Sequence, residues 1–228
     1  MGLGMNKISE NRGSDKRSQL RERNREALVE ATLDCVAELG IARSSVSEII
    51  ARAGLSRGMI HLHFETKDNL LKAAIERANE IYYDELEALL RQAGPSPQET
   101  IDAVVRSDLS ENVLNRRYVS IWYAFRGEAR EREVFRRLND TRDERMRTII
   151  LEAFLPMLRE QGTPDAELVA RDATDGLIAL LEGMWNDYLL HPGAFDRDQA
   201  CRVAFRFIAG LLPDYFTVAG ATQKGPAR

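Results

Sequence analysis

The stretch Ser45–Phe64, SVSEIIARAGLSRGMIHLHF, has the spacing of two short helices joined by a tight turn. Ser45 can cap the first helix, which Gly54 ends in a left-handed conformation, and Ser56 can cap the second. A longer helix is predicted to follow Thr66. Because a helix-turn-helix of this size places its second helix in the major groove of DNA, the pattern predicts a DNA-binding unit.

The second short helix has a composition that an ordinary solvent-facing helix would not have. It contains Gly58, and a glycine costs about 1 kcal/mol relative to alanine in a helix interior. Close approach of the backbone to a DNA phosphate would account for this glycine. The alternative is a helical corner in which His61 and His63 serve only the fold.

The sequence around this motif resembles the TetR family of bacterial transcriptional regulators. The resemblance covers Arg23 to about Ala73, and it is carried by Ala31, Gly40, Val46–Ile49, Ala53–Gly58, His63–Phe64 and Lys67–Leu71. It implies that residues in and around the second helix face DNA, namely Ser45, Val46, Arg57, Gly58, Met59, His61, Leu62, His63 and Lys67. By the same resemblance, Arg57 and Met59 would approach base edges, while His63 and Lys67 would contact phosphates.

Two positions in this set depart from the family pattern. The family often has hydroxyl or aromatic residues at the positions of Met59 and Leu62. Both side chains are apolar here, which predicts contact with thymine methyl groups in place of hydrogen bonds to base edges.

The distribution of charge agrees with a DNA-binding head on an acidic body. The chain of 228 residues has a net charge of −4. Residues 1–72 nevertheless contain twelve Lys and Arg against ten Asp and Glu, a net charge of +2, and the remainder has −6. Six basic residues lie between Arg12 and Arg25. We therefore expect residues 1–22 to form a basic, partly disordered arm that becomes ordered on phosphate.

Helical periodicity without strand alternation predicts an all-α fold of about nine helices. We expect a three-helix DNA-binding domain at 23–72, a regulatory domain for ligand binding and dimerisation at 73–213, and a disordered tail at 214–228. The two cysteines, Cys35 and Cys201, have no disulfide or metal spacing. No signal-peptide pattern and no apolar run near 20 residues is present, so the sequence predicts a cytoplasmic protein without a membrane partner.

The last two predicted helices, Asp165–Leu190 and Asp196–Leu211, carry more apolar surface than one small bundle needs. Their apolar residues spread over more than one face, and Gly176, Ala179 and Gly183 permit close approach of another helix. These features predict a homodimer formed through both helices across a two-fold axis. Two heads about 34–36 Å apart could then read a palindromic operator in double-stranded DNA.

A cluster of aromatic and acidic residues forms a candidate ligand site in the second domain. The candidate ligand-binding residues are Tyr118, Trp122, Phe125, Glu182, Trp185 and Tyr188. Aromatic faces beside carboxylates suit an organic cation, especially a quaternary ammonium. The alternative is that these rings form only the hydrophobic core.

The C-terminal half resembles a subgroup of the TetR family, the choline-responsive repressors of the glycine-betaine pathway. The resemblance runs from about Tyr118 to Pro213, and it is carried by Trp122–Phe125, Glu128–Ala129, Arg137–Asn139, Arg145–Met146, Asp175–Trp185, Ala200 and Arg202. Arg126 stands where the subgroup usually has an aromatic residue, and Glu182 stands where it usually has Asp. Arg126 would repel a cation unless its side chain faces solvent or pairs with an acid.

Together these patterns predict a ligand-responsive dimeric regulator, a repressor that leaves its operator when a small effector such as choline binds. One alternative is a regulator with a different apolar effector. Another is an architectural or division-control DNA-binding protein without a ligand switch. The chain has three histidines and neither a phosphate loop nor a nucleophile elbow, so we predict no catalytic residues, no metal, no cofactor and no enzymatic activity.

Overall fold

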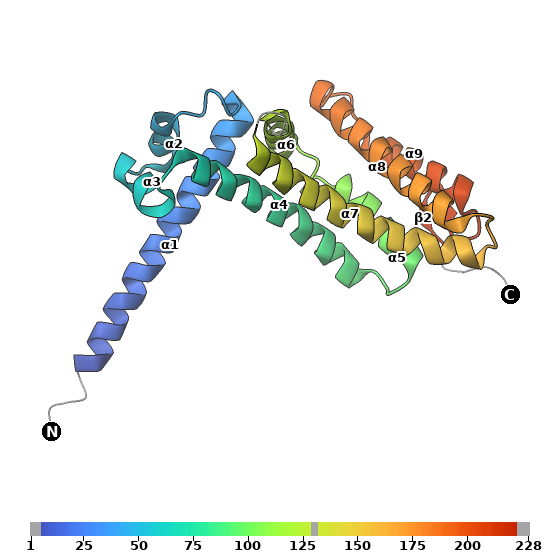
Figure 1. Cartoon of the computed structure of the whole chain (residues 1–228), viewed down its shortest axis with the longest axis horizontal. Helices are drawn as coiled ribbons and strands as arrows, with labels where there is room; N and C mark the ends of the chain where they lie inside the picture. Colours follow the sequence, from blue (N-terminus) through green and yellow to red (C-terminus); the bar gives the residue numbers. More distant parts are fainter. Residues whose placement is uncertain (1–5, 129–131, 223–228) are drawn as a thin grey trace. The chain divides into compact units, whose positions relative to one another are not determined.

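The computed structural model describes residues 6–128 and 132–222, and it describes side chains from residue 16 onward except at positions 139, 141 and 142 (Figure 1). Within these ranges the chain forms nine helices and one two-stranded ribbon. Their bounds are α1 Asn6–Leu39, α2 Val46–Ala53, α3 Arg57–Phe64, α4 Lys67–Gln92, α5 Pro97–Asp108, α6 Arg116–Glu128, α7 Glu133–Glu160, α8 Ala166–Leu190, α9 Arg197–Leu211, β1 Phe216–Thr217 and β2 Gly220–Ala221. This architecture confirms the predicted all-α fold with an N-terminal helix-turn-helix.

The chain divides into two compact units, one ending at Arg77 and the other beginning at Ala78. The division lies a little beyond the boundary expected after residue 72, and it falls inside α4. This helix therefore starts in the first unit and ends in the second.

The first unit packs α2 and α3 against the C-terminal half of α1 (Figure 1). Its core is made of the fully buried or nearly buried side chains of Leu28, Leu33, Val36, Ile49, Ile60, Phe64, Leu70, Leu71 and Ile75. These residues recur at helical spacing, so each helix presents one apolar stripe to the others. The same packing leaves the opposite faces of α2 and α3 at the surface.

Local chemistry fixes the two ends of α2. The Ser45 hydroxyl oxygen accepts a hydrogen bond from the Glu48 backbone N–H at 3.2 Å, as expected for an N-cap. Gly54 has φ +65° and ends the helix in the left-handed region, where glycine is favoured. Ser56 occupies the N-cap position of α3 with extended backbone, but its side chain makes no capping hydrogen bond.

Helix α1 begins earlier than the sequence pattern indicated. A start near Arg23 was expected, whereas the helix begins at Asn6 and includes the basic residues between positions 12 and 25. The side chains of Lys16, Arg17, Arg21 and Arg23 are exposed along it. Apolar periodicity begins only near Leu28, so it could not reveal this polar N-terminal half of the helix.

The second unit is a helical bundle with one continuous hydrophobic core. Helix α7 packs against α5, α6 and α8, and α8 also packs against α9. The largest fully buried side chains of this unit are Phe125, Phe135, Phe154, Phe205 and Phe216. A capping box begins α5, because Ser96 and Glu99 exchange side-chain and backbone hydrogen bonds. Helix α7 continues through Pro156.

The segment that follows α9 differs from the expected disordered tail. Tyr215 and Phe216 are buried, and Phe216 stacks on Phe205 of α9 at a ring-centroid distance of 6.5 Å. The Tyr215 hydroxyl donates a hydrogen bond to Glu160 Oε2 at 2.8 Å. These two rings add apolar area to the core and so order residues 214–222. The rest of the predicted tail lies outside the described residues.

None of the helices in the described part of the chain has both the length and the apolarity needed to cross a membrane. Cys35 is buried and Cys201 is half-buried, and both thiols are free. Burial raises the pKa of each thiol above its ordinary value.

Candidate functional site

Helix α3 presents one buried face and one open face. Ile60 and Phe64 anchor it to the core of the first unit. The open face carries Arg57, Gly58, His61 and Leu62, all exposed, and Leu62 as a residue is 58% exposed. A large apolar side chain at this exposure does not stabilise the single chain, so the face is suited to contact with another molecule.

Arg57 is held in position by the preceding helix. Its Nη2 atom donates a hydrogen bond to the Ser47 hydroxyl oxygen at 3.3 Å, which links α3 to α2. Gly58 lies beside it with open space around its Cα, because an added Cβ would meet only Ser56 Oγ, at 4.0 Å. Packing within the chain therefore does not require glycine at this position.

The remaining predicted DNA-facing residues surround this face and differ in accessibility. Ser45 is exposed, with its hydroxyl engaged in the α2 cap. Val46, Met59, His63 and Lys67 are half-buried. The structure thus brings the whole predicted set to α3 and to the first residues of α2 and α4.

His63 is the member of this set with a perturbed environment. Its Nε2 atom is buried and has no hydrogen-bond partner in the described part of the chain. Burial lowers the pKa of the imidazole, and the positive charges of Arg21 and Arg25 on α1 lower it further. The folded chain therefore favours neutral His63.

Lowering the pH should destabilise the wild-type protein more than a His63→Gln variant. In the unfolded chain His63 binds a proton near its ordinary pKa of about 6.5, whereas the folded chain resists that proton. The stability that depends on neutral His63 is therefore present above this pH and is lost as the pH falls through the folded pKa. Urea denaturation at pH 7.5 and 5.5 measures the difference. The exposed His191 provides the control variant His191→Gln, and equal losses in all three proteins would contradict this assignment.

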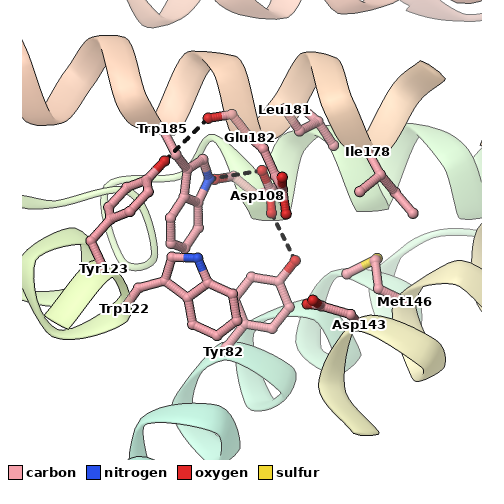
Figure 2. A pocket seen from close by; sticks show the side chains of 10 residues that line it. All are labelled: Tyr82, Asp108, Trp122, Tyr123, Asp143, Met146, Ile178, Leu181, Glu182 and Trp185. Carbon is pink, nitrogen blue, oxygen red and sulfur yellow. Dashed lines mark hydrogen bonds between the residues drawn. The ribbon is translucent and has the colours of Figure 1, made fainter. Parts of the chain in front are cut away.

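The second unit contains a cavity between α4, α5, α6, α7 and α8 (Figure 2). Its volume is about 40 Å³, which corresponds to about three water-sized groups. The lining residues are Tyr82, Asp108, Trp122, Tyr123, Asp143, Met146, Ile178, Leu181, Glu182 and Trp185. Four aromatic rings and three carboxylates therefore meet in one small space.

Asp108 organises the aromatic side of this cavity. It is the last residue of α5 and is 6% exposed. Its Oδ1 atom accepts a hydrogen bond from the Tyr82 hydroxyl at 2.7 Å, and its Oδ2 atom accepts one from Trp185 Nε1 at 2.8 Å (Figure 2). The Trp185 ring also meets Trp122 edge to face, with a centroid distance of 6.3 Å. A buried carboxylate thus fixes two rings of an aromatic box.

The rim of the cavity, formed by Glu182 and Asp143, is paired with Arg126, the residue that departs from the subgroup pattern. Its Nη1 atom lies 2.6 Å from Glu182 Oε1, and its Nη2 atom lies 3.5 Å from Asp143 Oδ2. The guanidinium carbon also lies 5.2 Å from the Trp122 ring centroid. Arg126 was expected to repel a cation unless it faced solvent or paired with an acid. The structure shows that it pairs with acids.

Tyr123, which follows Trp122 on α6, also lines the cavity. Its hydroxyl donates a hydrogen bond to the Glu182 carbonyl oxygen at 3.4 Å (Figure 2). Burial raises the pKa of the phenol, the negative charge of Glu182 raises it further, and Arg126 opposes the shift. The ring thus keeps its proton and acts as a neutral donor.

The structure places three of the six predicted ligand residues in this cavity and three elsewhere. Trp122, Glu182 and Trp185 line it. Phe125 is fully buried against Phe135, at a centroid distance of 5.4 Å, and it belongs to the core. Tyr118 faces a separate shallow groove with Asp84 and Glu85, and Tyr188 packs on Phe195 beneath Arg197. Helical spacing shows which residues share one face of a helix. It does not show which of those residues line a cavity and which pack in the core.

Sequence reasoning missed Tyr82, Asp108, Asp143 and Met146, because they come from helices without an aromatic stripe. Asp108 did carry a signal. It lies two helical turns after Ile101 and one turn after Val104, so the sequence places an acid on the buried stripe of α5. Tyr123 is adjacent to Trp122 in the sequence but is absent from the predicted site.

Both units match known families. Residues 28–74 match the family described as bacterial regulatory proteins, tetR family, and residues 97–213 match the family described as BetI-type transcriptional repressor, C-terminal. The HTH-type transcriptional regulator BetI of Serratia proteamaculans is 30% identical over 192 residues, which cover 82% of this chain and 92% of the relative. The protein of the same name from Stenotrophomonas maltophilia is 28% identical over 184 residues, 81% of this chain and 90% of the relative.

Solved structures of transcriptional regulators are also similar to this chain. A Pseudomonas aeruginosa PAO1 protein described as a transcriptional regulator superposes with a TM-score of 0.74 at 28% identity, covering 84% of this chain and 91% of its own. A Saccharomonospora viridis regulator in complex with choline has a TM-score of 0.68 and covers 84% and 96%, and its 22% identity shows a shared fold. The chain therefore belongs to the TetR family, with a C-terminal domain of BetI type, and it is a transcriptional regulator and not an enzyme.

Proposed function

We propose that the chain is a homodimeric repressor that binds a palindromic operator through α3 and is released by an organic cation, with choline as the first candidate. The observation that carries this proposal is the joint presence of an open α3 face and an aromatic–carboxylate cavity in one chain. Because the target is chromosomal DNA, the proposed site of action is the cytoplasm.

The DNA-binding part of the proposal rests on the open face of α3. Arg57 supplies a guanidinium that can bind a guanine edge with two hydrogen bonds. Met59 and exposed Leu62 supply apolar surface for thymine methyl groups. Exposed basic residues on α1, such as Arg17 and Arg21, can neutralise phosphates and would make the affinity depend strongly on salt.

The dimer part rests on the outward faces of α8 and α9. These faces expose small or apolar residues that the single chain does not bury, namely Leu168, Ala179, Gly183, Val203 and Gly210. Small residues let a second pair of helices approach closely, and a two-fold axis would bury the same patch on both copies. Leu177, Leu181 and Met184, which also suggested the dimer in the sequence, pack inside the single chain.

The effector part rests on the chemistry of the cavity. Tyr82, Trp122, Tyr123 and Trp185 surround it with electron-rich faces, and Asp108 lies at the bottom with a compensating negative charge. Quaternary ammonium groups are bound by such aromatic cages. The choline complex of the S. viridis regulator supports choline as the first ligand to test.

Helix α4 offers a route from the effector to DNA. Its first residue, Lys67, belongs to the predicted DNA-facing set, and Tyr82 of the same helix donates its hydroxyl proton to Asp108. A ligand that changes the Tyr82–Asp108 contact therefore acts on the helix that contributes to the DNA-binding unit. Coupling free energies between such sites are about 1–3 kcal/mol, a change of about 5- to 150-fold in affinity.

The test is a selection of genomic DNA fragments by the purified protein, followed by fluorescence anisotropy on the selected operator. We expect a palindromic site, a dimer by light scattering, and release of the operator by choline. Release by apolar molecules and not by choline would favour a different effector. Many dispersed sites with no effect of any small molecule would replace this proposal with an architectural DNA-binding role.

A further inference from the structure

Arg126 supplies the cavity rim with a cation that the chain itself provides. Its guanidinium lies 2.6 Å from Glu182 Oε1, 3.5 Å from Asp143 Oδ2 and 5.2 Å from the Trp122 ring centroid. One aromatic face and two carboxylates are the groups that would bind an organic cation. Both acids line the cavity, as does Trp122 (Figure 2).

The contacts of Arg126 join three helices across the rim. Arg126 lies on α6, Asp143 on α7 and Glu182 on α8. The side chains of the three residues are 36%, 33% and 44% exposed. Ion pairs at this exposure are weak, since water screens them. The guanidinium can therefore leave at small cost when another cation replaces it.

The small volume of the cavity agrees with such an exchange. At about 40 Å³ it has room for about three water-sized groups, less than a trimethylammonium head group with its hydroxyethyl arm requires. Glu182 and Asp143, the two acids on the rim, are held by Arg126. Release of Arg126 would leave both carboxylates available to another cation.

We propose that Arg126 is an internal competitor of the effector and thereby sets its affinity and class. The effector is a compact monocation that displaces the guanidinium from Glu182, Asp143 and Trp122. This inference rests on the proposed organic-cation effector. It adds that Arg126 sets the effector concentration needed to occupy the cavity. It predicts that removing the charge of Arg126 strengthens cation binding, whereas an ordinary structural residue would weaken binding when replaced.

The two tryptophans of the chain, Trp122 and Trp185, both line the cavity, so their fluorescence reports its occupancy. Choline, glycine betaine and 3,3-dimethylbutan-1-ol, the neutral carbon analogue of choline, would be titrated into five proteins. These are the wild type, Arg126→Gln, Arg126→Met, Arg126→Lys and Arg159→Gln. The last is the matched control, because Arg159 forms an exposed ion pair with Glu167 at 2.5 Å outside the cavity lining.

Arg126→Gln and Arg126→Met should bind choline about tenfold more tightly than the wild type, because about 1–2 kcal/mol of competing cation–π and ionic contact is removed. Arg126→Lys and Arg159→Gln should stay near the wild-type affinity. The neutral alcohol should bind all five proteins alike, since the effect is one of charge. Circular dichroism identifies any variant that fails to fold. If one of the two neutral variants does not fold, the other still provides the test.

Three results would overturn the inference. If both neutral variants fold and bind choline no more tightly than the wild type, Arg126 does not compete with the effector. The effector would still be an organic cation. Tighter binding of glycine betaine than of choline, lost in both neutral variants, would make Arg126 a partner for an anionic group. Absence of cation binding by every protein would remove the effector class as well, while operator binding, measured separately, would still stand.

Discussion

Arg57→Ala should weaken binding to the selected operator about tenfold or more, the largest effect expected from one substitution on the open face of α3. Arg57 is exposed, and Ser47 positions its guanidinium at 3.3 Å. A bidentate arginine–guanine contact discriminates bases by about 1–3 kcal/mol, and a dimer loses it twice. Anisotropy titrations at several salt concentrations, with specific and scrambled duplexes, measure the loss.

Two further variants make the Arg57 result specific. Arg77→Ala removes an exposed arginine of the same unit that pairs with Glu30, and it should leave operator affinity nearly unchanged. Arg57→Lys keeps the charge without the bidentate geometry, and it should recover nonspecific binding but not base discrimination. Full operator affinity in Arg57→Ala would show that α3 does not read bases through this residue.

Asp108→Asn should leave the fold almost as stable as the wild type and yet weaken choline binding about tenfold or more. The amide oxygen can still accept from Trp185 Nε1, and the amide group can donate to the Tyr82 hydroxyl, so both contacts have a replacement. What disappears is the negative charge of a residue that is 6% exposed, at the bottom of the proposed cation site. Tryptophan fluorescence titration and urea denaturation separate the two effects.

Asp108→Ala provides the complementary variant. It removes the acceptor of the buried Tyr82 hydroxyl, and loss of a hydrogen bond to a carboxylate should lower the free energy of unfolding by about 2–3 kcal/mol. Choline binding should weaken in both variants, but only Asp108→Ala should be destabilised. If Asp108→Asn binds choline like the wild type, the carboxylate holds the rings in place and does not bind the effector.

The helix-turn-helix could be predicted from residues that act over a few positions. The Ser45 cap and left-handed Gly54 are local features, and the structure contains both of them. The start of α1 could not be predicted from the sequence, because the N-terminal half of this helix has no apolar stripe. The ordered residues after α9 were missed as well, since Tyr215 and Phe216 gain their order only from contact with distant parts of the bundle.

The candidate effector site shows where sequence reasoning stopped. Periodicity identified Trp122 and Trp185 as parts of the site, because both lie on aromatic stripes. The same argument included Phe125, which packs in the core. It could not include Asp143, whose partner Arg126 lies on a different helix.

The amino-acid sequence alone determined the all-helical class, the DNA-binding motif and the regulator family, because caps, turns and helical stripes depend on neighbouring residues. Only the tertiary structure showed that Asp108 joins Tyr82 and Trp185 and that Arg126 pairs with Glu182. Those contacts span 26, 77 and 56 positions along the chain. Their geometry follows from how five helices pack around one cavity, and no local pattern specifies that packing.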